Sequence, residues 1–247
     1  MSKFLERIKE RAKADKKTIV LAEGEEMRTV VAADKILKEG IANIILLGNK
    51  DKINELAKGL DISAATIIDP LTDARRAEFV EKFYEMRKAK GMTPEKAEET
   101  LKSVLYYGVM MVKEGLADGM VAGAVNATSN VLRPCLQILK TAPGTKLVSA
   151  FFVMVVPDCE YGYHGTFIYA DSGLNENPDA DAVSEIAISS AKSFKDLIEA
   201  DPVIAMMSYS TYGSAKSELV DKMVLATKLA KEKRPDLLLD GELQADA

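Results

Sequence analysis

Residues 17–47 (KTIVLAEGEEMRTVVAADKILKEGIANIILL) contain the pattern that decides the fold. A short β-branched run at 17–22 precedes a segment at 27–38 whose apolar residues recur at helical spacing. Gly40 suits the left-handed position that ends such a helix. A second apolar run follows at 43–47. This strand–helix–strand order predicts two parallel strands joined by a right-handed crossover.

The same alternation continues on the C-terminal side of this stretch. Further helices are expected at about 51–59, 73–90, 93–102, 103–114 and 130–141, and further strands at 66–69 and 118–122. The expected fold class is therefore α/β, with a mostly parallel, doubly wound sheet in the first domain.

A domain boundary is expected at Ala142-Pro143-Gly144, because proline and glycine interrupt the periodic pattern there. We therefore expect a first α/β domain at 1–143 and a second α/β domain at 144–247. In the second domain, strands at 147–156 and 165–170 are joined by a short loop, which predicts an antiparallel pair.

The rest of the second domain alternates again between helix and strand. Helices are expected at 178–200 and 214–233, and strands at 203–207 and 237–239, so that the sheet of this domain would be mixed. The chain ends soon after 237–239, where another helix should follow. Because parallel sheets are not usually left with an unfinished crossover, we expect a truncated chain whose second domain is incomplete.

Composition and charge exclude several classes of protein. The net charge is −5, with 33 basic and 38 acidic residues spread along the chain, so no basic surface for nucleic acid is expected. No apolar run reaches the roughly 18 residues of a membrane span, and the start lacks the apolar region of a signal peptide. Two cysteines without a paired motif fit a reducing cytosol.

The loop and helix start at 118–134 are the first candidate site. Ligands of doubly wound sheets bind beyond the carboxyl ends of the strands. Thr128, Ser129 and Asn130 can each cap the following helix, whose free N–H groups would attract an anion. Pro134 should lie in the first turn of that helix, and Arg133 adds a forked cation suited to phosphate. The alternative is an ordinary capped helix whose arginine faces solvent.

Two further loops follow strands and are rich in polar residues. Their candidate substrate-binding residues are Asp171, Asn175, Ser208, Ser210, Gly213 and Ser214. Local capping and side-chain turns are the favoured explanation for Asp171 and Asn175, and they explain the residues of the second loop as well as substrate binding does. The acidic stretch 240–246 could hold structural caps, a metal site or neither, and the sequence leaves this open.

Familiar catalytic and nucleotide-binding motifs are absent from the sequence. The lone His164 has no zinc-ligand spacing, no GxSxG is present, and Cys159 is interpreted as a buried thiol. Neither a Walker A loop nor a GxGxxG occurs. We expect no metal and no cofactor. Arg87, by its pattern alone, is one more solvated charge on a helix.

Five segments resemble, in order, blocks of the phosphate acetyltransferase (phosphotransacetylase) family. They are 22–33 (AEGEEMRTVVAA), 118–139 (DGMVAGAVNATSNVLRPCLQIL), 169–191 (YADSGLNENPDADAVSEIAISSA), 208–218 (SYSTYGSAKSE) and 234–247 (RPDLLLDGELQADA). The resemblance implies a two-domain α/β/α fold like that of isocitrate and isopropylmalate dehydrogenases. It also implies a cytoplasmic homodimer that converts acetyl-CoA and phosphate to coenzyme A and acetyl phosphate.

The resemblance also implies roles for particular residues. Two arginines of the family's site fall on Arg87 and Arg133, which would be catalytic clamps for phosphoryl oxygens. The serine, arginine and aspartate that bind phosphate and activate the thiol lie in a C-terminal segment of the family with no counterpart here. We therefore expect little activity from this chain. The alternatives are a phosphate butyryltransferase, a catalytically inactive fragment, and an NAD(P)-dependent dehydrogenase of the same fold.

Overall fold

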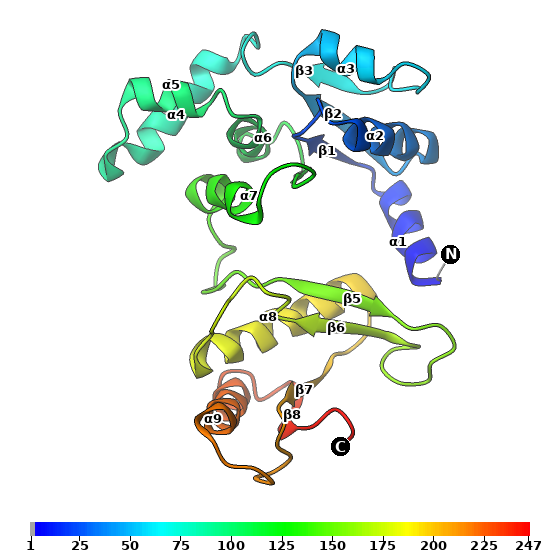
Figure 1. Cartoon of the computed structure of the whole chain (residues 1–247), viewed down its shortest axis with the longest axis vertical. Helices are drawn as coiled ribbons and strands as arrows, with labels where there is room; N and C mark the ends of the chain where they lie inside the picture. Colours follow the sequence, from blue (N-terminus) through cyan, green and yellow to red (C-terminus); the bar gives the residue numbers. More distant parts are fainter. Residues whose placement is uncertain (1–2) are drawn as a thin grey trace. The chain divides into compact units, whose positions relative to one another are not determined.

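The computed structural model describes residues 3–247, which divide into two compact units (Figure 1). The first, called the N-terminal unit here, is Lys9–Lys140; the second, the C-terminal unit, comprises residues 3–8 and 141–247. The elements up to residue 140 are α1 (Lys3–Ala14), β1 (Lys17–Leu21), α2 (Met27–Glu39), β2 (Ala42–Leu47), α3 (Lys50–Leu56), β3 (Thr66–Ile68), α4 (Arg76–Arg87), η1 (Lys88–Lys90), α5 (Pro94–Thr100), α6 (Val104–Lys113), β4 (Gly119–Val121), α7 (Thr128–Pro134) and η2 (Cys135–Leu139).

The N-terminal unit is built on a four-stranded parallel sheet in the order β3-β2-β1-β4. Successive side chains of a strand point to opposite faces, so each face has its own core. Val20 and Leu47 pack with the helices α4 and α6, whereas Leu21 and Leu46 pack with α2 and α3. The α/β class and the parallel sheet expected from the sequence are confirmed.

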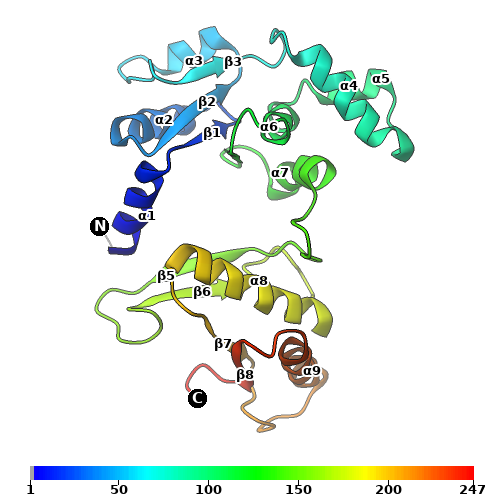
Figure 2. The same cartoon turned by 180° about the vertical axis from the view of Figure 1, so that it is seen from behind.

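The C-terminal unit contains β5 (Phe151–Val155), β6 (Thr166–Ala170), α8 (Ala180–Ile198), β7 (Val203–Met207), α9 (Glu218–Lys233) and β8 (Leu238–Leu243). β5 and β6 form the expected antiparallel pair, and β7 pairs with β8 in parallel. Helices α8 and α9 cover one face of the β7–β8 pair through a core that includes Met206, Ala226 and Leu239 (Figure 2).

The mixed sheet expected for this unit is wrong, because the described strands form two separate pairs. The expected strand 147–156 is shortened to Phe151–Val155. Its first part bonds instead to the loop after β6: Asn175 donates to the Val148 carbonyl, and the Ala150 N–H donates to Asp171. A backbone engaged by these side chains cannot also form a strand ladder.

The single helix expected at 130–141 is also wrong. α7 begins at Thr128 and ends at Pro134, and the chain continues through one π-helical turn at Cys135–Leu139. Pro134 lies at the end of α7 rather than in its first turn. A proline inside a helix removes one N–H and crowds a preceding carbonyl, which explains why regular winding stops there.

Gly24 lies where the chain after β1 passes closest to β2. Its N–H donates to the Leu47 carbonyl at 3.0 Å, and a Cβ at position 24 would lie 2.6 Å from that same oxygen. Because the obstacle is backbone, no side-chain rotation can relieve it. Any larger residue must therefore push the two strand ends apart.

We expect Gly24→Ala to lower the free energy of unfolding by about 1–3 kcal/mol, the usual cost of a steric clash in a packed core. The matched control is Gly119→Ala in β4, where the nearest atom, Ile19 Cδ1, would be 3.5 Å away. The control should change stability by less than about 1 kcal/mol. Equal stability of the two variants in urea unfolding would show that the close approach is unimportant.

Candidate functional site

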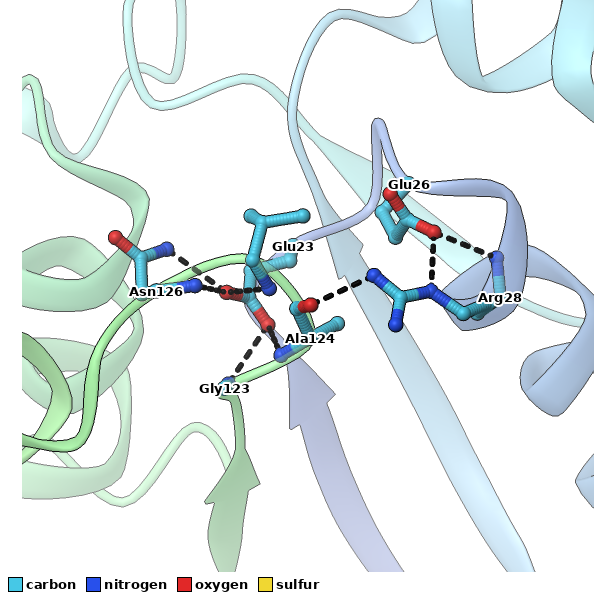
Figure 3. Close-up of polar contacts among 7 residues, drawn as sticks. Glu23, Glu26, Arg28, Gly123, Ala124 and Asn126 are labelled. Carbon is cyan, nitrogen blue, oxygen red and sulfur yellow. Dashed lines mark hydrogen bonds and ion pairs between the residues drawn. The ribbon is translucent and has the colours of Figure 1, made fainter.

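The carboxylate of Glu23 occupies the loop that follows β4 (Figure 3). Glu23 is only 7% exposed. Its Oε2 accepts from the N–H groups of Gly123 at 2.7 Å and Ala124 at 2.6 Å. Its Oε1 accepts from the N–H groups of Val125 and Asn126 and from the side-chain amide of Asn126, at 2.8–3.0 Å. Five donors therefore converge on one carboxylate.

These donors keep Glu23 ionised. Burial by itself would raise the pKa of the carboxyl group, but the hydrogen bonds outweigh burial and lower the pKa to about 2. The loop 123–126 therefore presents a ring of N–H groups to an anion, and that anion is a side chain of the protein. The sequence predicted free N–H groups at the start of the following helix and did not indicate that Glu23 binds the loop before it.

Glu23 also occupies the place where doubly wound sheets usually bind ligands. The strand order β3-β2-β1-β4 puts β1 beside β4, and the chain returns to this edge after passing through β2 and β3. Ligands of such sheets bind beyond the carboxyl ends of the strands, where the strand order reverses. The N–H groups of the loop at that point therefore bond to a carboxylate of the protein itself.

Arg28 adds a second connection to the same loop (Figure 3). Its Nη2 donates to the Ala124 carbonyl at 2.7 Å, and its Nε donates to Glu26 at the same distance. The guanidinium is largely exposed. Both the N–H groups and one carbonyl of the loop are thus held by residues that follow β1.

The start of α7 differs from the sequence prediction. Ala127 occupies the cap position and no side chain caps the helix. Thr128, Ser129 and Asn130 form the first turn instead and are exposed. The prediction that one of them caps the helix is wrong, because helical winding begins earlier than the pattern indicated. Their hydroxyl and amide groups remain accessible to solvent.

Arg133 and Arg87 come from different helices of the N-terminal unit and share a neighbour, Tyr106. Arg133 lies on α7 and is exposed, whereas Arg87 is the last residue of α4 and has a buried Nε. Burial raises the pKa of the Tyr106 phenol, and the charges of Arg133 and Arg87 both act to lower it. Among residues 3–247, neither guanidinium has a hydrogen bond or an ion pair.

A hollow of about 300 Å³ opens beside Arg87. Its lining residues are Arg87, Lys90, Gly91, Met92, Lys96, Glu99 and Thr100. Three of these side chains are cations and one is an anion, so the hollow carries a local positive charge within an acidic protein. The sequence pattern alone predicted that Arg87 is a solvated charge on a helix. In the structure, its Nε is buried.

Asp171 and Asn175, in the C-terminal unit, hold their own loop. Asp171 Oδ1 accepts from the N–H groups of Gly173 and Leu174 at 2.7 Å, and its Oδ2 accepts from Asn175 Nδ2 at 2.6 Å. Burial opposes the ionisation of Asp171, yet these bonds lower its pKa. Asp171 and Asn175 therefore form hydrogen bonds within the loop that follows β6, as expected for local capping and side-chain turns.

The loop after β7 is anchored by Glu242, which belongs to the acidic stretch 240–246. Ser210 is fully buried and its hydroxyl donates to Glu242 Oε1 at 3.0 Å. The Gly213 N–H donates to the same oxygen at 2.7 Å and is the main reason that the pKa of Glu242 is lowered. Ser208 and Ser214 each accept one backbone N–H through the hydroxyl oxygen.

The open question about 240–246 has a partial answer. Glu242 anchors the loop above, and Asp240 accepts from the Tyr212 hydroxyl and from Lys231. No group of three or more potential metal ligands occurs among the described residues.

None of the described helices is long and apolar enough to cross a membrane.

We expect Glu23→Gln to lower the free energy of unfolding by about 2–3 kcal/mol at neutral pH, since it removes the charge that five donors stabilise. The depressed pKa means that the contribution is present above pH 4.5 and is lost as the pH falls towards 2. The difference between wild type and variant should therefore shrink over that range.

The control for this experiment is Glu55→Gln, an exposed residue of α3 whose ion pair with Lys58 is on the surface. It should alter stability by less than about 1 kcal/mol. A Glu23→Gln difference that stayed constant between pH 7 and pH 2.5 would contradict the assignment of a depressed pKa to Glu23.

Comparison with known proteins places the whole described chain in one family. Residues 3–247 match the family model described as phosphate acetyl/butaryl transferase. The phosphate acetyltransferase of Acetivibrio thermocellus is 62% identical over 244 residues, covering 99% of this chain and 74% of the relative. A phosphotransacetylase structure from Streptococcus pyogenes superposes with a TM-score of 0.91 at 40% identity, covering all of this chain and 74% of the other. The EutD phosphotransacetylase from Staphylococcus aureus gives 0.86 at 39% identity, covering 98% of this chain and 72% of the other. This chain belongs to the phosphate acetyl/butaryl transferase family.

Proposed function

We propose that this protein transfers an acetyl group between coenzyme A and phosphate, by the reaction acetyl-CoA + phosphate = CoA + acetyl phosphate. Family membership supports the reaction class and speaks against the dehydrogenase alternative. The high-identity relatives from Acetivibrio thermocellus and Thermoanaerobacterium thermosaccharolyticum are both named phosphate acetyltransferase, which favours acetyl over butyryl as the acyl group.

The observation that carries the proposal is the pair of unpaired arginines around Tyr106. Several arginines of this chain form an ion pair with a carboxylate two positions away. Arg28 pairs with Glu26, Arg75 with Asp73, and Arg234 with Asp236. Arg87 and Arg133 have no such partner among the described residues. A partly buried guanidinium without a partner is costly, so an anion that binds there is stabilised.

The chemistry of an acyl phosphate matches these two cations. Its phosphoryl group offers several anionic oxygens, and a guanidinium can donate two parallel hydrogen bonds to such a group. A thiolate that attacks the acetyl carbon must approach an anion, and neighbouring positive charge reduces that repulsion. As the carbon–oxygen bond breaks, the leaving phosphate gains charge, which the same arginines stabilise.

Positioning is the main contribution that these residues can make. Holding two reactants in the correct geometry can contribute on the order of 7–11 kcal/mol to lowering the barrier. The thiol of coenzyme A also has to be deprotonated, since a thiol with a pKa near 8.5 is mostly protonated at pH 7. We assign Arg133 and Arg87 to the first task and no residue of 3–247 to the second.

The other candidate residues take two kinds of role in this proposal. Thr128, Ser129 and Asn130 are exposed next to Arg133 on α7 and would contact substrate oxygens. Ser208 and Ser214 use their oxygens to accept backbone N–H groups, which leaves each hydroxyl hydrogen free to donate to a substrate.

The remaining candidates, Asp171, Asn175, Ser210 and Gly213, would hold the binding loops in shape. Their side chains or N–H groups bond within those loops. We further propose a cytoplasmic homodimer with the two-domain architecture of the isocitrate dehydrogenase type. Two compact units, one with a parallel doubly wound sheet, support the architecture.

We expect Arg133→Ala to weaken the binding of acetyl phosphate about 10-fold or more, because a charge-assisted contact to the phosphoryl group is lost. Binding is measured by isothermal titration, and the rate of acetyl-CoA formation from acetyl phosphate and CoA is measured in parallel. Thermal stability should change little, since Arg133 is exposed and has no bond to any described residue.

The matched control is Arg234→Ala, which removes an exposed, ion-paired arginine from the C-terminal unit. It should bind acetyl phosphate as the wild type does. Unchanged affinity and turnover in Arg133→Ala would remove this arginine from the site and leave the proposed anion-binding geometry without support.

A further inference from the structure

The turn that follows Pro134 has an unusual geometry. The Lys140 N–H donates to the Cys135 carbonyl, five residues earlier, at 3.0 Å, so the segment Cys135–Leu139 winds as a π-helix. Single π-helical turns are rare and frequently occur at functional sites. The wider turn changes which side chains of the segment face the neighbouring helix α6.

Gln137 is the side chain of this segment that forms a hydrogen bond with α6. The hydroxyl group of Tyr106 donates to Gln137 Oε1 at 3.1 Å, in a partly buried setting. On its other side the Tyr106 ring packs edge-on against Phe83 of α4, with ring centroids 5.6 Å apart and an interplanar angle of 71°. One side chain of α6 therefore contacts both α4 and the turn after α7.

The two contacts of Tyr106 lie one helical turn from the two arginines. Arg87 is four residues after Phe83 on α4, and Arg133 is four residues before Gln137. Residues four apart in an α-helix project from the same face, which applies to Phe83 and Arg87 of α4, whereas the chain passes into the π-helical turn between Arg133 and Gln137. The charges of both arginines reach the phenol group, which agrees with this placement.

Neither guanidinium has a hydrogen bond or an ion pair among the described residues, so only packing and the backbones of α4 and α7 hold the two arginines in place. The hydrogen of the phenol is directed to Gln137, so the phenol oxygen keeps its lone pairs as acceptors.

We infer that Tyr106 and Gln137 are positioning residues for the anionic substrate: their hydrogen bond fixes the α7–η2 segment against α6 and α4, so that Arg133 and Arg87 present their guanidinium groups to one phosphoryl group. This inference rests on the proposed function. It adds two uncharged residues to the site, neither of which has to touch the substrate.

A double-mutant cycle tests the inference. Tyr106→Phe removes only the hydroxyl group, and Gln137→Met removes the acceptor at similar length. Each variant should bind acetyl phosphate about 5-fold more weakly, the effect expected of one lost hydrogen bond. The double variant should bind no more weakly than the weaker single variant, because both changes break the same bond.

The control is Tyr84→Phe, a partly buried tyrosine of α4 that packs against the same core but forms no hydrogen bond with Gln137. It should bind acetyl phosphate as the wild type does. Thermal unfolding of all variants separates effects on folding from effects on binding, since a purely structural bond would shift the unfolding midpoint and leave the affinity of the folded protein unchanged.

Three results would overturn the inference. The first is wild-type affinity in Tyr106→Phe and Gln137→Met while Arg133→Ala binds weakly, which would leave the proposed function standing. The second is fully additive losses in the double variant, which would mean that the two residues act independently. The third is wild-type affinity in Arg133→Ala, which would overturn the proposed anion site and this inference together.

Discussion

The hydrogen bonds between the Glu23 carboxylate and the N–H groups of residues 123–126 hold the loop that precedes α7. They join the end of β1 to the loop after β4, two segments separated by a hundred residues in the chain. α7 begins directly after this loop, so the position of Arg133 depends on it. A buried carboxylate is tolerated in this place because its donors replace the lost water.

The C-terminal unit uses the same device. Glu242 accepts from Ser210 and from the Gly213 N–H, and so holds the loop that follows β7. In both units, then, a carboxylate at a strand end bonds to a loop at a neighbouring strand end. In the N-terminal unit, this carboxylate lies beyond the carboxyl ends of the strands, where many doubly wound sheets bind a ligand.

The sequence predicted the strands of the fold better than it predicted the ends and irregular turns of the helices. Periodicity was sufficient for the parallel strands β1 to β4 and for the antiparallel pair β5–β6. It failed at Pro134, because a proline is more common in the first turn of a helix than before a π-helical turn. The helix start at Thr128 was missed for the same reason.

The site was only partly predictable because its contacts join distant parts of the chain. Arg133 stands out locally, since it follows a small-residue loop, whereas Arg87 resembles any charged residue of a surface helix. Glu23 gave one signal that could have been used, namely a charged residue immediately after a buried strand. No local sequence pattern distinguishes Tyr106 or Gln137, which form a hydrogen bond with each other across thirty-one positions of the chain.

Measuring the pKa of Glu23 tests directly whether its carboxylate is ionised and bonded to the loop that precedes α7. NMR titration of protein carrying ¹³C-labelled glutamate measures the pKa without altering the molecule. We expect a pKa of about 2, because five hydrogen bonds to the carboxylate outweigh the effect of burial. A pKa near the ordinary 4.5, or above it, would contradict the account, because it would mean that the loop and the helix that carries Arg133 are not held by this carboxylate.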